Sequence, residues 1–478
     1  MAFDIHQPRL LIGRNWVTAT ESYEVINPYN NQRIATVPLG DAALLDHAIA
    51  VAHATFEQTR RQPAFERAQV LHAAAAIMEG RKRRLADTIV AEAGKPITLA
   101  EAEVSRAIMT LTASAEAARR ANGEVLDLDA FSSGAGHVGL ARRFPIGVVY
   151  CITPFNFPLN LVCHKIGPVL ATGNTAVLKP APRTPLSALL LADILLEAGM
   201  TPGQVNVVTV PNALASRPLT DERVRMVSFT GSVTVGWQIA EQAARKKIVL
   251  ELGGNAPAIV EADADLTAAV PLLAAGGFGY AGQSCIHTQR IYVHASIYDM
   301  FRAQYLKQVA SKIKAGDPSD PATIVGPMID RANVDRVASW VHEAVAGGAN
   351  LLCGGRANGP IYKPTVLENV PANAKVLQEE IFGPVVVLQP YNTLDEAIDL
   401  ANGTRYGIHA SLFTRDLATA FAAYDRLDFG GVLINQAPTF RVETLPYGGV
   451  KDSGVGREGV RYAMDDMTEI KALVMNLK

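Results

Sequence analysis

The sequence has few cysteines, no long apolar run and no recognisable secretion signal. Its four cysteines in 478 residues are scattered, without paired or metal-ligand spacing, so neither a disulfide framework nor a metal site is expected. Residues 1–9 include Asp4 and no apolar stretch, which argues against a secretory signal. No window approaches the roughly 20 uninterrupted apolar residues that a membrane-spanning helix needs. We therefore expect a protein of the reducing cytoplasm that has no membrane partner.

The sequence has almost no excess of charge of either sign. The formal net charge is −2, and the longest block of like charge is Arg81-Lys82-Arg83-Arg84. This block lies between two apolar stretches at helical spacing, which favours a solvated helix face over a nucleic-acid patch. We expect no nucleic-acid partner. The length predicts two or three lobes, at about 100–200 residues per domain.

The order of strand-like and helix-like segments predicts an α/β protein. Short strands are expected in the first 40 residues, followed by helices up to about Gly123, the first of them capped by Asp41. Short, near-continuous apolar strands then alternate with helices, which is typical of a parallel sheet covered on both faces. The expected strands of this sheet are 147–152, 175–178, 205–208, 226–229 and 248–252. A second α/β series spans 256–449, and 469–477 is expected to be a terminal strand.

Two segments carry residues suited to acid–base or nucleophilic chemistry. Cys285 follows a run of small residues, 274–281, that is expected to be helical; a cysteine in such a place is either a nucleophile or a buried small side chain. Glu251 ends the expected strand 248–252, at the strand end where α/β proteins bind ligands. Partial burial would raise its pKa towards that of a general base, although a glutamate at the rim fits equally.

Two further segments suit anion binding. Asn156 lies between Pro154 and Pro158, where its amide could donate to an oxyanion or cap the next helix. Residues 229–236 read as a strand, a glycine turn and a helix, which places helix N–H groups where a phosphate can bind. This segment is neither a Walker A loop, because Trp237 follows it, nor the three-glycine dinucleotide fingerprint.

In their order and context these segments resemble the aldehyde dehydrogenase superfamily, from Ile26-Asn27-Pro28 to 467–471. The shared motifs are Lys179-Pro180, Glu251-Leu252-Gly253-Gly254, Gly282-Gln283-Ser284-Cys285, Glu380-Ile381-Phe382-Gly383-Pro384 and Pro446-Tyr447-Gly448-Gly449-Val450-Lys451. The resemblance implies a Rossmann-type cofactor domain, an α/β catalytic domain and a small β oligomerisation arm. Their expected bounds are 1–124 with 144–252, 253–450, and 125–143 with 463–478. It further implies a homodimer or a homotetramer.

The resemblance also implies how an aldehyde is oxidised to its acid. Cys285 corresponds to the nucleophile, and the Asn156 amide and the Cys285 backbone N–H correspond to the oxyanion donors. Glu251 corresponds to the base that activates water for hydrolysis of the thioester. Lys165 and Glu469 match a proton relay, although Lys165 fits a surface lysine at a helix end equally well.

For the cofactor, the resemblance places Lys179 at the adenosine ribose and Glu380 at the nicotinamide ribose. Phe382 is expected to flank the nicotinamide, and the positions near the pyrophosphate are Phe155, Gly231 and Ser232. Members that prefer NAD have a glutamate where this chain has Pro182, and here Arg183 follows. The loss of a carboxylate and the gain of a cation make NADP acceptable as well as NAD.

For the substrate, Ser284 argues against a phosphorylated aldehyde, because members that bind one often have arginine there. Arg106 and Arg441 match positions that contact an anionic tail, with Phe157 beside them, and arginine suits a carboxylate. Both arginines also fit ordinary surface ion pairs. A small hydroxy- or carboxy-aldehyde, of the lactaldehyde or semialdehyde type, is therefore expected. The alternatives are a CoA-acylating aldehyde dehydrogenase, which generally lacks the glutamate at 251, and a catalytically silent scaffold of the same fold.

Overall fold

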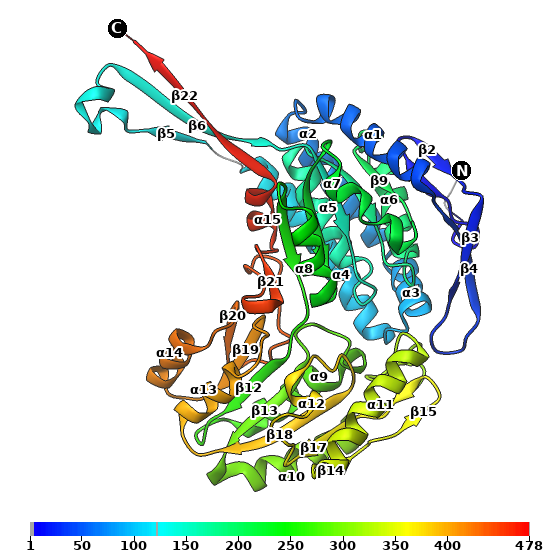
Figure 1. Cartoon of the computed structure of the whole chain (residues 1–478), viewed down its shortest axis with the longest axis vertical. Coiled ribbons are helices and arrows are strands. Elements are labelled where there is room, and N and C mark those ends of the chain that lie inside the picture. Colours follow the sequence, from blue (N-terminus) through cyan, green and yellow to red (C-terminus); the bar gives the residue numbers. More distant parts are fainter. Residues whose placement is uncertain (1–3, 121–122, 478) are drawn as a thin grey trace.

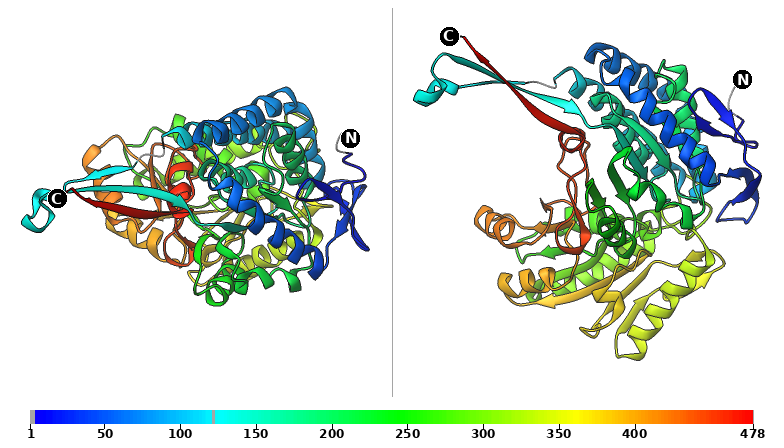
Figure 2. Two further views of the ribbon diagram at one scale, coloured as in Figure 1. Left: turned by 90° about the horizontal axis from the view of Figure 1, so that it is seen from above. Right: turned by 45° about the horizontal axis from the view of Figure 1, so that its top comes forward.

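The computed structural model describes residues 4–120 and 123–477. Two lobes, each built on a sheet, lie one above the other, and a long β arm projects from the first lobe (Figure 1). The right-hand view of Figure 2 again shows the arm clear of both lobes. This is the α/β architecture that the sequence predicts. None of the described helices has the length and the apolar character needed to cross a membrane.

The sheet of the first lobe contains eight strands in the order β2-β1-β9-β8-β7-β10-β11-β21. Their bounds are β1 Leu10–Ile12, β2 Asn15–Val17, β7 Val148–Ile152, β8 Thr175–Lys179, β9 Val205–Val207, β10 Val224–Thr230, β11 Lys247–Glu251 and β21 Gly454–Val455. The strands from β9 to β11 are parallel, and they match the five predicted strands. The antiparallel edge strand β21 comes from late in the chain, outside the predicted bounds of this domain.

Helices cover both faces of this sheet. Their bounds are α1 Ala42–Thr59, α2 Ala64–Gly80, α3 Lys82–Ala93, α4 Ile97–Arg119, α5 Asn160–Thr172, α6 Leu186–Glu197, α7 Arg217–Thr220 and α8 Val233–Gln242. Asp41 caps α1 as predicted, since its side chain accepts from the Leu44 N–H. Every residue of α5 is buried, because α2, α4 and α15 (Val460–Asp466) pack around it.

The second lobe has a seven-stranded sheet in the order β14-β17-β18-β13-β12-β19-β20. Its strands are β12 Ala256–Val260, β13 Thr288–His294, β14 Asn350–Cys353, β17 Thr365–Glu368, β18 Val385–Tyr391, β19 His409–Phe413 and β20 Gly431–Ile434. All are parallel except the edge strand β14. Its helices are α9 Leu266–Phe278, α10 Tyr298–Lys312, α11 Arg331–Ala346, α12 Lys375–Gln378, α13 Leu394–Asn402 and α14 Leu417–Arg426.

The chain leaves α9 earlier than the sequence predicts. We expect a helix through 281, but α9 ends at Phe278 and a tight turn follows. Tyr280 and Ala281 have φ values of 52° and 55°, in the left-handed region that side chains other than glycine disfavour. The buried Tyr280 hydroxyl donates to the Ala93 carbonyl, and its backbone N–H donates to the Ile324 carbonyl. These tertiary contacts stabilise the turn that leads to Cys285.

The arm is a three-stranded antiparallel sheet in the order β22-β6-β5. β22 Thr468–Asn476 pairs along its full length with β6 His137–Pro145, and β5 Glu124–Leu126 lies on the other side of β6. The predicted terminal strand is therefore confirmed. Two short hairpins complete the fold, β3 Glu21–Ile26 with β4 Arg33–Leu39 and β15 Ala357–Asn358 with β16 Ile361–Tyr362.

Candidate active site

A cavity of about 930 Å³ lies where the two lobes meet. Its walls come from the ends of β10 and β11, the loop before α5, the turn after α9 and the segment 436–447. Twelve residues predicted for the site line it. They are Arg106, Phe155, Asn156, Phe157, Gly231, Ser232, Glu251, Ser284, Cys285, Glu380, Phe382 and Arg441. Residues far apart in the sequence thus share one cavity large enough for a cofactor and a small substrate.

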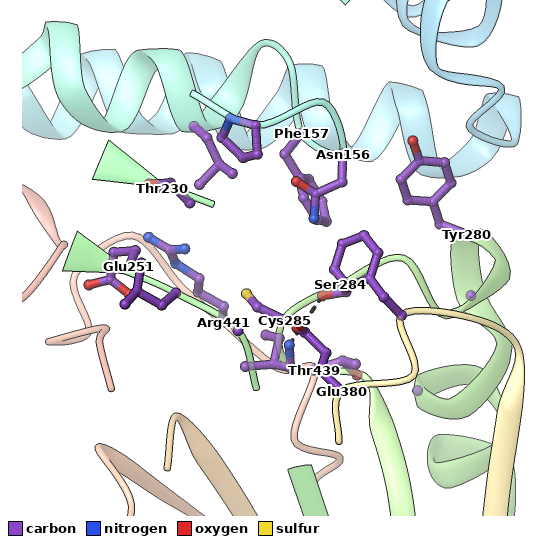
Figure 3. Close-up of a pocket in the computed structure, with 18 of the residues that line it drawn as sticks. Asn156, Phe157, Thr230, Glu251, Tyr280, Ser284, Cys285, Glu380, Thr439 and Arg441 are labelled. Atoms are coloured by element: carbon purple, nitrogen blue, oxygen red, sulfur yellow. Dashed lines mark hydrogen bonds between the residues drawn. The ribbon is translucent and has the colours of Figure 1, made fainter. Parts of the chain in front are cut away.

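Cys285 is partly exposed to this cavity, and its thiol has one hydrogen-bond contact within the part of the chain that the structure describes. Its Sγ lies 2.8 Å from the hydroxyl of Tyr447. Burial, reinforced by the carboxyl groups of Glu380 and Glu251, raises the pKa of Cys285 to about 12, while Tyr447 and Arg441 act to lower it. Figure 3 shows the sulfur in the gap between the segment that carries Asn156 and the strand end that carries Glu251.

Asn156 faces Cys285 across the cavity (Figure 3). Its Nδ2 donates to the backbone carbonyl of Gln283 over 3.0 Å, and the side chain is buried. An amide nitrogen has two N–H groups, so this contact fixes the amide and leaves the second N–H for another acceptor. Within the described part of the chain its Oδ1 has no partner.

A buried glutamate from another helix holds the start of α5, next to Asn156. No side chain caps α5 from within. Instead, Oε1 of Glu103 on α4 accepts from the backbone N–H groups of Leu159 and Asn160, at 3.0 and 3.1 Å. The other oxygen of Glu103 pairs with buried Lys95, whose Nζ lies 3.5 Å from the centroid of the Phe157 ring. Glu103 and Lys95 together fix the loop of Asn156.

A buried glutamate from another helix also caps the start of α6, after the loop that contains Pro182 and Arg183. Glu92 on α3 is buried and accepts from the backbone N–H groups of Leu186 and Ser187, at 2.7 and 2.9 Å. Burial raises the pKa of Glu92 to about 7. Two internal carboxyl groups thus position two loops at the end of the first sheet.

Glu251 ends β11 with its side chain buried at 2% exposure. Neither of its carboxyl oxygens has a hydrogen-bond partner among residues 4–120 and 123–477. Burial and the nearby negative charge of Glu458 raise the pKa of Glu251 well above its usual range. A carboxyl group in this environment takes up a proton more readily than an exposed one, as a general base must.

The two residues predicted to form a relay do not meet. Lys165 is buried within α5, so its interpretation as a surface lysine is wrong. Its Nζ contacts Ser228 at 2.9 Å and Glu458 at 3.2 Å. Glu469 instead lies on the exposed strand β22 and pairs with Lys247 over 2.8 Å, with 65% of its side chain exposed. The buried carboxylate next to Lys165 is Glu458.

Sequence reasoning missed Glu458, although a signal for it was present. It lies seven residues beyond the motif that ends at Lys451, in the segment Gly456-Arg457-Glu458-Gly459. Its backbone pairs with that of Tyr447 inside the motif. Lys165, Arg441 and His164 hold the pKa of Glu458 at about 2, so this carboxylate stays ionised although it is buried.

Arg441 is not a surface residue. Only 7% of its side chain is exposed, Nη2 contacts Glu458 at 3.1 Å, and the guanidinium lies 3.7 Å from the centroid of the Tyr447 ring. Arg106 is three-quarters buried and pairs with Glu443 over 2.7 Å. Glu443 also contacts the buried ring of His164. The alternative of ordinary surface ion pairs is therefore wrong.

Glu443 and His164 were not predicted, although each is a close neighbour in sequence of a predicted residue. Within the described residues, Arg106 Nη2 and Arg441 Nε are buried and have no partner. The cluster therefore keeps unused cationic donors beside the nucleophile.

Five of the predicted cofactor residues line the cavity: Phe155, Gly231 and Ser232 from the first lobe, and Glu380 and Phe382 from the segment before β18. Ser232 occupies the N-cap position of α8 without capping it, which leaves the helix N–H groups available to a phosphate. Glu380 accepts from the Gly254 N–H over 2.9 Å, and burial raises its pKa to about 7. Phe382 packs edge-on against Phe155, with ring centroids 5.8 Å apart.

Three of the predicted cofactor residues lie outside the cavity lining. Lys179 ends β8 with its side chain buried, and its Nζ contacts Asn212 at 3.4 Å. Pro182 and Arg183 follow on the exposed loop before α6, where Arg183 pairs with Asp330 over 3.3 Å. These residues, with the open helix end at Ser232, fit an extended dinucleotide better than a compact ligand.

Comparison with known proteins agrees with this geometry. The aldehyde dehydrogenase family matches residues 16–473. The 3-sulfolactaldehyde dehydrogenase of Priestia aryabhattai is 41% identical, with 99% of each chain covered. The NADP(+) succinate-semialdehyde dehydrogenase of Escherichia coli K12 is 39% identical, also with 99% of each chain covered.

A solved structure extends the likeness to the whole fold. Aldehyde dehydrogenase 21 from Physcomitrella patens, in complex with the reaction product succinate, superposes with a TM-score of 0.97 at 42% identity, covering 99% of both chains. The likeness covers both lobes and the arm, and the chain therefore belongs to the aldehyde dehydrogenase family.

Proposed function

We propose that this protein oxidises a short aldehyde with an anionic or hydroxyl-bearing tail to the carboxylic acid, with NAD⁺ or NADP⁺ as the oxidant. The observation that carries the proposal is the meeting of the Cys285 thiol, the Asn156 amide and the Glu251 carboxyl group in one cavity between the two lobes. A nucleophile, an oxyanion donor and a base are the groups that oxidation through a thioester requires.

The thiolate of Cys285 attacks the aldehyde carbon, and the carbonyl oxygen becomes an oxyanion. The second N–H of Asn156 and the backbone N–H of Cys285 donate to it. Bound NAD(P)⁺ supplies the acceptor for the hydride that leaves when the oxyanion collapses to a thioester. Glu251 then removes a proton from water, which attacks the thioester and releases the acid.

Glu458 and Lys165 suit the removal of the proton that Glu251 takes up. Glu458 raises the pKa of Glu251 through its charge and contacts Lys165 at 3.2 Å. We infer a route through these two residues in place of the expected route through Glu469. Glu469 lies exposed on β22, so it is poorly placed to exchange protons with the buried base Glu251.

The charged cluster around Arg441 and Arg106 supports an anionic tail. The Arg441 guanidinium covers one face of the Tyr447 ring, whose hydroxyl touches the nucleophile. The Tyr447 ring thus lies between the thiol and the guanidinium and sets the distance between them. This distance favours a substrate with only a few carbons between its aldehyde group and its anionic tail. The relatives named above act on a sulfonated lactaldehyde and on succinate semialdehyde, both short and anionic. Carboxylate and sulfonate tails fit the unused arginine donors equally.

The exposed loop that carries Pro182 and Arg183 supports the use of NADP⁺ as well as NAD⁺. An arginine that is 57% exposed is free to turn from Asp330 towards a 2′-phosphate. The arm supports a homodimer or a homotetramer, because β22 leaves one edge unpaired among the described residues and exposes apolar side chains. These are Ile470, Leu473, Val474 and Met475.

The test is the reduction of NAD⁺ and NADP⁺ with a panel of aldehydes of equal length that carry carboxylate, sulfonate, hydroxyl or no polar group. Wild type is compared with Cys285→Ala and with Cys353→Ala, a control cysteine on β14. We expect reduction by wild type and the control, loss in Cys285→Ala, and the highest kcat/KM with the anionic aldehydes. Folded wild type that reduces neither cofactor would support a silent scaffold. Formation of acyl-CoA in place of the acid, when CoA is added, would identify a CoA-acylating enzyme.

A further inference from the structure

We propose that Tyr447 is a catalytic residue, whose phenolic O–H donates a hydrogen bond to the thiolate of Cys285 and so favours ionisation of the nucleophile. The two side chains, 162 positions apart in the chain, place sulfur and oxygen 2.8 Å apart. The inference rests on the proposed function for the identity of the nucleophile alone.

The direction of this hydrogen bond follows from the surroundings of the phenol. The Tyr447 side chain is buried at 2% exposure, and within residues 4–120 and 123–477 its hydroxyl contacts no hydrogen-bonding atom besides the Cys285 sulfur. A thiol that donated to the phenol would leave the phenolic proton buried without an acceptor, which is unfavourable. Donation from the phenol satisfies that proton, and a thiolate is a much stronger acceptor than a thiol.

The charges around the pair make such a donor necessary. Glu251 and Glu380 face Cys285 and oppose its ionisation, while Arg441 favours it. Burial has the largest effect on the pKa of the thiol, and it raises this pKa as the two carboxyl groups do. Burial also raises the pKa of Tyr447 well above its usual range, so the phenol keeps its proton at every pH at which the enzyme would work.

The Tyr447 side chain is held in place from three sides. The Arg441 guanidinium stacks on its ring at 3.7 Å, and His409 meets the ring edge-on at 5.2 Å between centroids. The backbone of Tyr447 exchanges two hydrogen bonds with that of Glu458, at 2.9 and 2.6 Å. A donor fixed in this way needs no reorganisation when the thiol ionises.

In the chemical step Cys285 loses a proton and attacks the aldehyde, while Tyr447 only stabilises the charge on the sulfur. Ionisation passes the thiol proton to solvent water, and the phenol retains its own proton. As the S–C bond to the aldehyde forms, the electron pair of the C=O double bond moves to oxygen, and the charge that Tyr447 stabilised leaves the sulfur. The hydrogen bond therefore favours the thiolate before attack, so its loss is expected to matter most at pH values where the thiol is largely protonated.

The experiment is alkylation of Cys285 by iodoacetamide across a range of pH, followed by mass spectrometry, in wild type and Tyr447→Phe. The phenylalanine ring preserves the stacking with Arg441. We expect the midpoint of the profile to rise by about one pH unit or more and alkylation at neutral pH to slow by about tenfold or more. The two profiles are expected to converge at high pH. Tyr424→Phe, which alters a tyrosine that is 63% exposed on α14, is the matched control and is expected to match wild type.

An unchanged midpoint in a folded Tyr447→Phe protein would overturn the proposal, as would a slowing that persists above both midpoints, where the thiol of each protein is ionised, because that indicates a structural role alone. Incorporation of monofluorinated tyrosine in the otherwise wild-type chain gives a second readout that does not depend on the variant folding. The more acidic phenol is expected to lower the midpoint of thiolate absorbance, corrected with Cys285→Ser, and an unchanged midpoint there also contradicts the proposal. Alkylation needs neither aldehyde nor cofactor, so a failure of the proposed function leaves this result intact.

Discussion

Glu251 and Glu458 are two buried carboxyl groups with opposite ionisation preferences. Glu458 lies between Lys165 and Arg441, which hold its pKa at about 2. Glu251 has no hydrogen-bonding partner among the described residues, and burial beside Glu458 raises its pKa. Environments that push two pKa values apart separate the two acid–base roles. Glu458 is thus suited to remain a charged acceptor while Glu251 takes up and releases the proton.

Replacement of Glu251 by glutamine is expected to slow hydrolysis of the thioester and to spare its formation. The steady-state rate should fall by roughly 10²–10⁴-fold, while a burst of one reduced cofactor per site remains and the acyl-enzyme accumulates. In wild type the hydrolytic rate should rise with pH through the raised pKa of Glu251, because only the ionised form is a base. Stopped-flow absorbance and intact-protein mass spectrometry measure both quantities.

Glu261→Gln, which changes a glutamate that follows β12, is the control for Glu251→Gln and should keep wild-type turnover. Loss of the burst together with turnover in Glu251→Gln would contradict a role confined to hydrolysis.

Arg106 can be tested for its role in substrate recognition without disturbing the nucleophile. Arg106→Gln is expected to lower kcat/KM for carboxylate or sulfonate aldehydes by about 10–100-fold, since hydrogen bonds to charged groups contribute roughly 1.5–3 kcal/mol. Uncharged aldehydes of equal length should lose little. Arg83→Gln, on the exposed face of α3, is the matched control. An equal loss for charged and uncharged aldehydes would show that Arg106 serves Glu443 and the fold instead of the substrate.

At the scale of elements, α5 and α6 begin after loops that carry residues predicted for the site, and both helices are capped by glutamates from other helices. The buried carboxyl group of Glu92 makes the free energy of unfolding depend on pH. Folded Glu92 keeps its proton up to about pH 7, whereas an ordinary glutamate loses it near 4.5. Between these values the folded state binds more protons than the unfolded state, so the free energy of unfolding falls as pH rises.

Glu92→Gln is expected to flatten this dependence between about pH 4.5 and 7. A glutamine carries no ionisable proton and keeps one of the two oxygens that accept from the Leu186 and Ser187 N–H groups. The effect amounts to about 1.4 kcal/mol for each unit by which the pKa is raised. Urea unfolding at several pH values measures it, and the difference between variant and wild type cancels the contribution of Glu380. Parallel curves for the two proteins would contradict the raised pKa.

The local pattern of the sequence predicts the elements better than it predicts their partners. The strands from β7 to β11 follow from short apolar runs between turn residues, because a strand covered on both faces has no polar alternation. The turn at Tyr280 and Ala281 could not be predicted, since contacts with Ala93 and Ile324 override the helical preference of small residues. For the same reason Glu92 and Glu103, ordinary helix residues in sequence, gave no sign of capping distant helices.

In the site too, residues that stand in motifs were predicted and several residues outside any motif were missed. Cys285, Glu251 and Asn156 stand in motifs, and the structure brings them together. Glu443 and His164 lie beside predicted residues but outside any motif, so only the fold reveals their contacts. The relay was assigned to Glu469 because its position resembles that of the family's relay, whereas burial favours Glu458.

At the scale of the whole molecule, the arm projects away from the first lobe (Figure 1). We expect Leu473→Glu with Met475→Glu, two exposed apolar residues on one face of β22, to lower the molar mass measured by light scattering. The control is Phe421→Glu, which changes a still more exposed apolar residue on α14. A double variant with the mass of wild type, or a monomeric wild type, would argue against assembly through the arm.

The return of the chain to the first lobe has a consequence for synthesis. β21 completes the edge of the first sheet only after the second lobe has been made, and Ser453 just before it bonds to both Gly253 and Gly407. On the ribosome, the first 250 residues therefore emerge without their edge strand and without Glu458, the partner of Lys165. A nascent chain stalled before residue 450 is expected to present an open strand and an unpaired buried cation to chaperones. The nucleophile gains Arg441 and Tyr447 only after the last strand of the second sheet, β20, has been made.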